Sequence, residues 1–382
     1  MTLRVSQRAA SVSPFIVMDV MRAAYEREIQ GQHIVHLEVG QPSTSAPKGV
    51  IEAAKAALDR DRIGYVDALG IPALRERIAG HYRDTYGLAL PPERVVVTQG
   101  SSGAFLLSFL SSFEHGDRVA LAAPGYPAYR NILSALGFEP VDLLTDTDHK
   151  YQPTVDLLRR AGKVAGLIVA SPSNPTGTTV SEAEMQALAH YCHVHGIRLI
   201  SDEIYHGIVF GGEIVTAAAC SDSAIVINSF SKYFSMTGWR LGWMVVPPDM
   251  LRAIECLAQN LFISAPALSQ LAAVAAFDCK EELDGHVRRY RENRDLLLAE
   301  LPKAGLDRLT IPDGAFYLYA DVSHLSNDSR DFCRRMLVEA GVAATPGLDF
   351  DRQRGHGTLR ISFAGATAEM AEAARRLQGW KR

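Results

Sequence analysis

The sequence predicts an α/β fold with two domains: a large domain with a mostly parallel sheet covered by helices on both faces, and a smaller α+β domain. At 382 residues the chain exceeds the size that one hydrophobic core usually supports. Between about residues 50 and 246, short apolar runs bounded by turn residues alternate with helical patterns, which is typical of buried parallel strands. Past residue 281 the pattern changes, which indicates the second domain.

Five apolar runs in the first part are predicted to be strands buried on both faces. They are VVVT at 95–98, RVALAAP at 118–124, GLIVASP at 166–172, IRLISDE at 197–203 and AIVINSF at 224–230. A helix is expected at 181–195, where Ser181 and Glu184 form a capping box and Gly196 ends the helix.

The second part begins with the amphipathic helix EELDGHVRRYRENRDLLLAEL at 281–301. We expect strands at 314–322 and 358–364, a helix near 329–340 and a final helix from Thr367. Since no single linker is visible, the long helix is expected to join the domains, and the N-terminal segment to return to the smaller one. This gives a large domain at 46–284 and a small domain at 1–45 and 285–382.

Composition excludes some classes of partner and location. The chain is 47% hydrophobic and 21% charged with a net charge of −4, which gives no reason to expect nucleic acid or an anionic membrane as partner. The first fifteen residues lack the apolar run of a signal peptide, and no stretch is long enough to span a bilayer. Five scattered cysteines favour a reducing compartment, so we expect a cytoplasmic protein.

Chemically active side chains follow each predicted strand of the large sheet. Ligands of open parallel sheets bind beyond the carboxyl ends of the strands, so these loops are expected to meet at one edge. The loops are QGSSG at 99–103, PGYP at 124–127, SPSNPTG at 171–177, DEIY at 202–205 and SFSK at 229–232. Together they supply hydroxyls, an amide, a carboxylate, phenols and a lysine.

Lys232 stands among Phe230, Tyr233, Phe234 and Met236 rather than among polar neighbours. An ammonium in such surroundings is expected to be partly desolvated, which lowers its pKa and makes the amine a better nucleophile.

The glycine-rich turn before the helical pattern at 104–113 offers backbone N–H groups and the hydroxyls of Ser101 and Ser102 to an anion. Ser229 and Arg240 could complete this site, because a guanidinium binds phosphate in a bidentate way. The turn matches neither the Walker pattern nor GxGxxG, and such a turn can also be purely structural.

The other loop residues each have a structural alternative. Asp202 could be a helix N-cap, Asn174 a turn residue and Tyr126 a core residue. Taken together with Lys232 and the anion site, they fit pyridoxal 5′-phosphate, which needs a lysine, a phosphate site and a carboxylate for its ring nitrogen.

The stretch at 229–242, with S-x-S-K and then G-W-R-L-G, resembles the cofactor attachment signature of the class I/II pyridoxal-phosphate-dependent aminotransferases. SPSNPTG, SDEIY and LRISFA look like further signatures of this family, and the resemblance runs from about Gly40 to Arg360. It implies the fold type I of these transferases, as in aspartate aminotransferase. It also implies ping-pong transfer of an amino group from an L-amino acid to a 2-oxo acid.

The resemblance assigns roles around the cofactor ring. Lys232 would be the Schiff-base lysine and the proton shuttle. Asp202 would hold the ring nitrogen, and Asn174 and Tyr205 would donate hydrogen bonds to the 3-oxygen of the ring. Tyr126, at a position where family members often carry tryptophan, would stack on the ring.

By the same resemblance, the cofactor phosphate would be bound by Ser101, Ser102, Ser229 and Arg240. Tyr65 would reach the phosphate of the neighbouring subunit, which implies a homodimer with shared active sites.

For the substrate, the resemblance implies that Arg360 clamps the α-carboxylate beside Asn174, and that Gly40 leaves room for this carboxylate. The sequence shows no obvious second cation for a distal carboxylate, and a serine stands in the GSSG loop where some relatives carry lysine. Both features weaken aspartate and glutamate as sole preferred donors, and neither amino acid is excluded.

Two other functions stay open at this point: a C–S β-lyase or other elimination enzyme that uses the same residues, and a non-catalytic sensor domain of the same fold. A metal site is not predicted, since in HYCHVHG at 190–196 only His190 and His193 share a helix face, without a matching carboxylate or cysteine pair.

Overall fold

The computed structural model describes residues 3–211 and 214–381. Over these residues, seven strands form one sheet in the order β2-β8-β7-β6-β5-β3-β4. Within it β8 runs antiparallel to both neighbours, whereas the other adjacent pairs are parallel. The predicted fold class is therefore confirmed. The strands are β2 (Val95–Thr98), β3 (Arg118–Ala123), β4 (Glu139–Leu144), β5 (Gly166–Ala170), β6 (Arg198–Asp202), β7 (Ile225–Ser229) and β8 (Gly242–Val245).

The large sheet is buried on both faces because alternate side chains enter two hydrophobic cores. Val95 and Val97 of β2 pack into one core with residues of α3, α4 and α8, whereas Val96 packs into the other with residues of α5, α6 and α10. The helices of this domain are α3 (Lys48–Arg60), α4 (Pro72–Tyr86), α5 (Gly100–Ser112), α6 (Pro127–Leu136), α7 (Val155–Arg160), α8 (Glu182–Val194), α9 (Ala217–Cys220), α10 (Leu251–Leu261) and α11 (Ala267–Ala273).

The helix α8 begins with the capping box that the sequence predicts. The Ser181 side chain accepts from the backbone N–H of Glu184, and the Glu184 side chain accepts from the backbone N–H of Ser181. The predicted capping box is confirmed.

The smaller domain is built on a four-stranded antiparallel sheet in the order β12-β13-β10-β9. A separate parallel pair joins β1 to β11. Its elements are β1 (Val35–His36), β9 (Arg308–Thr310), β10 (Tyr317–Asp321), α13 (Ser329–Arg335), a π-helical turn (Met336–Ala340), β11 (Val342–Ala343), β12 (Thr345–Pro346), β13 (Thr358–Ser362) and α14 (Thr367–Gly379).

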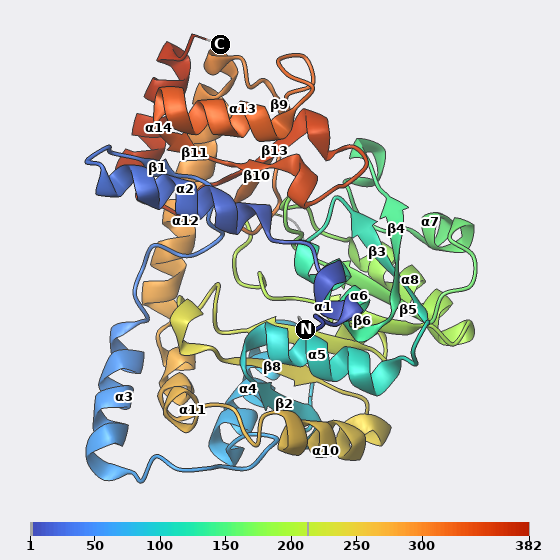
Figure 1. The fold of residues 1–382 in the computed structure, drawn as a ribbon. Coiled ribbons are helices and arrows are strands. Elements are labelled where there is room, and N and C mark those ends of the chain that lie inside the picture. Colours follow the sequence, from blue (N-terminus) through green and yellow to red (C-terminus); the bar gives the residue numbers. More distant parts are fainter. Residues whose placement is uncertain (1–2, 212–213, 382) are drawn as a thin grey trace.

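Three segments run between the domains: the stretch between α1 (Gln7–Ser11) and α2 (Ile16–Ile29), residues 37–47 between β1 and α3, and α12 (Lys280–Glu300) (Figure 1). The helix α12 puts Leu283 into a core of the large domain and Leu297 into the core of the small one. At the other end of the chain, α1 lies against α6, whereas α2 packs on β11 and β12. The short segment between α1 and α2 therefore crosses from the large domain to the small one.

Candidate active site

A cavity of about 350 Å³ lies beyond the carboxyl ends of the large-sheet strands. All five post-strand loops contribute to its wall, together with the small domain and α2. The predicted site residues that line it are Gly40, Ser101, Ser102, Tyr126, Asn174, Asp202, Tyr205, Lys232, Arg240 and Arg360. The meeting of the two domains thus brings residues more than 300 positions apart, such as Gly40 and Arg360, to one place.

Lys232 follows β7 and extends into this cavity, where Nζ donates a hydrogen bond of 2.6 Å to the carbonyl of Gly40. Burial lowers the pKa of its amine to about 8, helped by the charges of Arg360 and Arg240 and opposed by the carboxylate of Asp202. Near neutral pH the unprotonated, nucleophilic fraction of the amine is therefore larger than that of a solvent-exposed lysine.

Asp202 ends β6 and is 2% exposed. The Tyr129 hydroxyl donates to its Oδ2, and the N–H of Ile204 donates to Oδ1 at 3.1 Å. Burial raises the pKa of this carboxyl to about 6, against these hydrogen bonds and the charge of Lys232. Sequence reasoning missed Tyr129, although it stands one helical turn after Tyr126 in the first turn of α6.

Arg360 projects from β13 and is 4% exposed. Its Nη1 donates to Asn174 Oδ1 at 2.9 Å and its Nη2 to the Glu38 carbonyl at 2.5 Å. The guanidinium carbon lies 4.4 Å from the ring centre of Tyr317 and 4.8 Å from that of Phe350. Its Nε is buried without a hydrogen-bond partner among the described residues.

The contacts of Arg360 leave its Nε without a hydrogen-bond partner among the residues that the structure describes, which is unusual for a buried guanidinium. Neither Tyr317 nor Phe350 was predicted from the sequence, because no local pattern points to a ring that packs through space. Tyr317 also links to the predicted site, since its hydroxyl lies 2.7 Å from that of Tyr205.

One corner of the cavity is suited to an anion. Ser101 and Ser102 stand in the first turn of α5, where backbone N–H groups lack helical partners. Gly100 has a φ of +67°, and a Cβ at this position would come within 2.6 Å of Nη2 of Arg240. Glycine is therefore required for the guanidinium to approach the start of α5.

Two predicted residues lie elsewhere. The Ser229 hydroxyl is buried and donates to the Leu241 carbonyl at 3.2 Å and to the Ser231 hydroxyl at 2.9 Å. Among the described residues, it is Ser231 rather than Ser229 that lines the cavity. Tyr65 is 85% exposed and outside the cavity wall as described. The phosphate roles of Ser229 and Tyr65 stay predictions.

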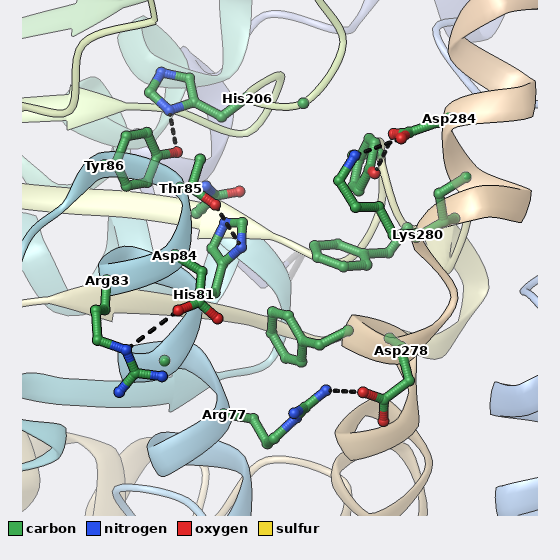
Figure 2. Close-up of a pocket in the computed structure, with 18 of the residues that line it drawn as sticks. Arg77, His81, Arg83, Asp84, Thr85, Tyr86, His206, Asp278, Lys280 and Asp284 are labelled. Atoms are coloured by element: carbon green, nitrogen blue, oxygen red, sulfur yellow. Dashed lines mark hydrogen bonds and ion pairs between the residues drawn. The ribbon is translucent and has the colours of Figure 1, made fainter.

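A larger cavity of about 750 Å³ lies between α4, the start of α12 and the turn after Tyr205 (Figure 2). In its wall His206 Nδ1 pairs with the Tyr86 hydroxyl at 2.7 Å, and burial lowers the pKa of His206 to about 3, so that the ring is neutral. At its rim, Arg77 pairs with Asp278 and Lys280 with Asp284 (Figure 2). Within the described lining, none of the predicted site residues occurs.

The large cavity therefore has paired charges and neutral rings, whereas the smaller one holds an amine, a carboxylate and an incompletely paired guanidinium. The smaller cavity is therefore the candidate active site.

Comparisons with known proteins identify the family of the chain. Residues 32–377 match the family described as Aminotransferase class I and II. The chain belongs to this family. It is 50% identical to valine–pyruvate aminotransferase of Mycobacterium tuberculosis over all of this chain and 99% of that protein. This aminotransferase thus moves an amino group from an amino acid to a 2-oxo acid, with pyridoxal 5′-phosphate as cofactor.

Solved structures show the same fold for this class I and II aminotransferase. An aminotransferase from M. tuberculosis matches with a TM-score of 0.97 at 50% identity, covering 99% of each chain. A putative aminotransferase from Silicibacter pomeroyi matches with 0.94 at 54% identity, also covering 99% of each. Aspartate aminotransferase from Thermus thermophilus with maleate matches with 0.93 at 31% identity, over 99% of this chain and 100% of that one.

The residues that line the cavity of the aminotransferase fit its cofactor. They offer an amine in Lys232, a buried carboxylate in Asp202, an aromatic face in Tyr126 and an anion corner at Ser101 and Arg240.

The described part of the chain has no helix long and apolar enough to cross a membrane. In the histidine cluster, His195 stacks on Tyr191 with ring centres 4.0 Å apart.

Proposed function

We propose that this aminotransferase takes its amino group from an amino acid with an aliphatic side chain and delivers it to a small 2-oxo acid such as pyruvate. The observation that carries the proposal is the buried, incompletely paired Arg360 beside the amine of Lys232. The 50% identity with a valine–pyruvate aminotransferase supports the aliphatic donor. Among the described lining residues the cations are Lys232, Arg240 and Arg360, which leaves none for a distal carboxylate.

Lys232 is the proposed catalytic residue. When bound, pyridoxal 5′-phosphate supplies an aldehyde that condenses with amines and a ring that withdraws electrons from the substrate Cα. The unprotonated Nζ of Lys232 first accepts the proton from the substrate Cα, as a general base. It later donates this proton again, as a general acid. A pKa near 8 suits both directions at neutral pH.

The remaining ring contacts are proposed from position and chemistry. Asp202 holds the ring nitrogen and is itself oriented by the Tyr129 hydroxyl. Asn174 and Tyr205 face the 3-oxygen, and Tyr126 covers one face of the ring. Each of these side chains lines the same cavity as Lys232, which supports the assignment.

The two anionic groups have separate proposed sites. Ser101, Ser102 and Arg240 bind the cofactor phosphate at the start of α5, together with Ser229 as the sequence predicts. The substrate α-carboxylate binds Arg360, whose unpaired Nε supplies a donor and whose Nη1 already orients Asn174.

We propose a homodimer in which Tyr65 of one subunit completes the phosphate site of the other. Tyr65 is exposed in the single chain together with nearby apolar side chains, Leu58 at 60% and Ile63 at 42%. Apolar side chains exposed along one segment favour a protein interface.

We propose domain boundaries of 46–284 for the large domain, with 1–45 and 285–382 forming the small one. The pairing of β1 with β11 and the division of α12 between two cores support these boundaries. A cytoplasmic location is proposed as well, because all five cysteines are free thiols.

The visible absorption spectrum of the purified enzyme tests the proposed function. We expect a band from the bound cofactor that bleaches with valine, isoleucine or alanine, changes little with aspartate, and returns when pyruvate is added. Release of pyruvate and ammonia from a cysteine conjugate, without need of an acceptor, would instead identify an elimination enzyme. Absence of the band after incubation with the cofactor would contradict the assignment of Lys232.

A further inference from the structure

The beginning of α2 forms one wall of the active-site cavity. Phe15, Val17, Met18 and Met21 line it, opposite the residues of the large-sheet loops. The Phe15 ring lies 5.9 Å from the ring of Tyr126, so this apolar wall reaches the place where the cofactor ring is expected. A donor side chain that enters this space meets hydrocarbon rather than charge.

A buried carboxylate caps the first turn of this wall. Oδ1 of Asp349 accepts from the backbone N–H of Ile16 at 3.1 Å, and Oδ2 accepts from that of Val17 at 3.3 Å. Asp349 is 6% exposed and lies more than 330 positions away in the sequence. Because Phe15 at the N-cap has no side-chain oxygen, Asp349 replaces the missing cap of α2 from another element.

The same carboxylate connects the wall to the site that is proposed to bind the substrate carboxylate. Asp349 directly precedes Phe350, whose ring lies 4.8 Å from the guanidinium of Arg360. The charge of Arg360 also acts on Asp349 and helps to keep it ionised against the effect of burial, which raises its pKa. The side chain and the carboxylate of the amino-acid substrate are thus expected to contact neighbouring groups of the protein.

Two other contacts hold the segment before α2. Arg352 Nη2 donates to the Ser13 hydroxyl at 3.0 Å, and Asn131 Nδ2 donates to the Ser13 carbonyl at 3.3 Å. Both contacts precede α2, which packs on β11 and β12. Among the described side-chain hydrogen bonds, those to Asp349 are the ones made by the backbone of the first turn of α2.

We propose that Asp349 is a positioning residue that fixes the first turn of α2 across the cavity, so that Phe15, Val17 and Met18 select donors with apolar side chains. The selectivity part rests on the proposed function. Without the carboxylate, the first turn of α2 loses its fixed position. Amino-acid donors whose side chains bind this wall then lose more affinity than donors with a short side chain.

The test uses the full-length holoenzyme with Asp349→Ala and Asp349→Asn, and Asp351→Asn as the matched control. Asp351 is equally buried in the same loop, but its described bonds go to Gln353 and Arg354 rather than to α2. Amide hydrogen exchange of the peptide that contains Ile16 and Val17 is measured first. We expect faster exchange in Asp349→Ala, an intermediate rate in Asp349→Asn, and the wild-type rate in Asp351→Asn.

The second measurement compares kcat/KM for valine and alanine. In Asp349→Ala we expect a loss of about tenfold for valine through KM, corresponding to about 1.4 kcal/mol, with alanine nearly unchanged. Unchanged exchange at Ile16 and Val17, or an equal loss for both donors, would overturn the proposal. If the wild-type enzyme transaminates neither donor, the proposed function fails, whereas the exchange rates still decide whether Asp349 holds α2.

Discussion

Arg360 Nη1 donates to Asn174 Oδ1 at 2.9 Å, and both side chains are at least nine-tenths buried. Arg360 belongs to a strand of the small sheet, and Asn174 to the loop after β5 of the large one. The bond therefore joins the two domains inside the cavity. A ligand that binds Arg360 also acts on the residue proposed to contact the cofactor ring.

Replacing Arg360 by lysine should weaken donor binding without unfolding the protein. Lysine keeps the charge but loses the planar, bidentate contact, and it leaves the Asn174 carbonyl oxygen without its donor. We expect kcat/KM to fall by about 100-fold, mostly through KM, and Arg360→Ala to lose about 2–5 kcal/mol. Steady-state kinetics checks this, with the melting temperature as the control for folding. A collapsed melting temperature with normal KM would mark Arg360 as structural.

Lys232→Ala should abolish transamination while the fold persists. The side chain is proposed to supply both the amine that holds the cofactor and the base that moves the Cα proton, so we expect a loss of about 10³-fold or more. Lys232→Arg is the matched variant, because it retains a cation in the cavity but provides no nucleophile of suitable pKa. Half-reactions followed by absorbance measure the effect, and turnover in either variant argues against the assignment.

The rate at which the apoenzyme takes up its cofactor should rise with pH and level off above about 8. Only the neutral amine of Lys232 attacks an aldehyde, and burial lowers its pKa to about 8. At pH 7 about one tenth of the amine is neutral, and at pH 9 about nine tenths. Stopped-flow absorbance gives the pH midpoint of the uptake rate. The same measurement on free Nα-acetyl-lysine should give a midpoint near 10.4.

The Asp202→Asn variant provides an internal check on this pH dependence. The carboxylate of Asp202 raises the pKa of Lys232, so its removal should move the midpoint to lower pH. If the midpoint of the wild-type enzyme lay near that of free Nα-acetyl-lysine, the cavity would not desolvate the amine of Lys232.

Gly40→Ala should disturb the site through a clash. A methyl group at this position would overlap the Tyr317 hydroxyl, which pairs with Tyr205 at 2.7 Å. We expect a destabilisation of about 1–3 kcal/mol and a parallel loss of activity. Gly379→Ala at the end of α14 is the control, since a Cβ there meets nothing within 4 Å. Thermal unfolding should separate the two variants, and an unaffected Gly40→Ala would mean that Tyr317 moves aside freely.

Mixing two inactive variants should restore activity if subunits share their sites. A mixed dimer of Lys232→Ala and Tyr65→Ala chains contains one site with neither defect. After unfolding and refolding an equal mixture, we expect about a quarter of the wild-type activity, because about half of the dimers are mixed and each has one intact site. Each variant refolded alone serves as the control. Activity no greater than the sum of both would exclude a role for Tyr65 in trans.

Much of the fold is visible in the sequence because strands buried on both faces leave unmistakable apolar runs. The run at 95–98 matches β2 residue for residue, and those at 166–172 and 224–230 contain β5 and β7. By contrast β4 was missed. It lies at the sheet edge beside β3 alone, so it tolerates Pro140 and the charged Glu139 and Asp142.

The site could be predicted only where residues stand in ordered motifs beside the strands. Phe350 escapes such reasoning because no local pattern shows that its ring packs on Arg360. Tyr317 and Asp349 escape it because their contacts with Tyr205 and Ile16 join residues far apart in the chain. An aspartate in a loop is usually a turn former, and only the folded chain shows that this one caps a distant helix.

The origin of the cavity wall in two parts of the fold has an evolutionary consequence. The residues proposed to hold the cofactor come mostly from loops at the edge of the central sheet, whereas the apolar wall comes from α2, which packs on the small domain. Mutations in the wall or its anchor can therefore accumulate without loss of the cofactor chemistry. A lineage with this architecture can acquire new donors step by step, through intermediates that remain working enzymes.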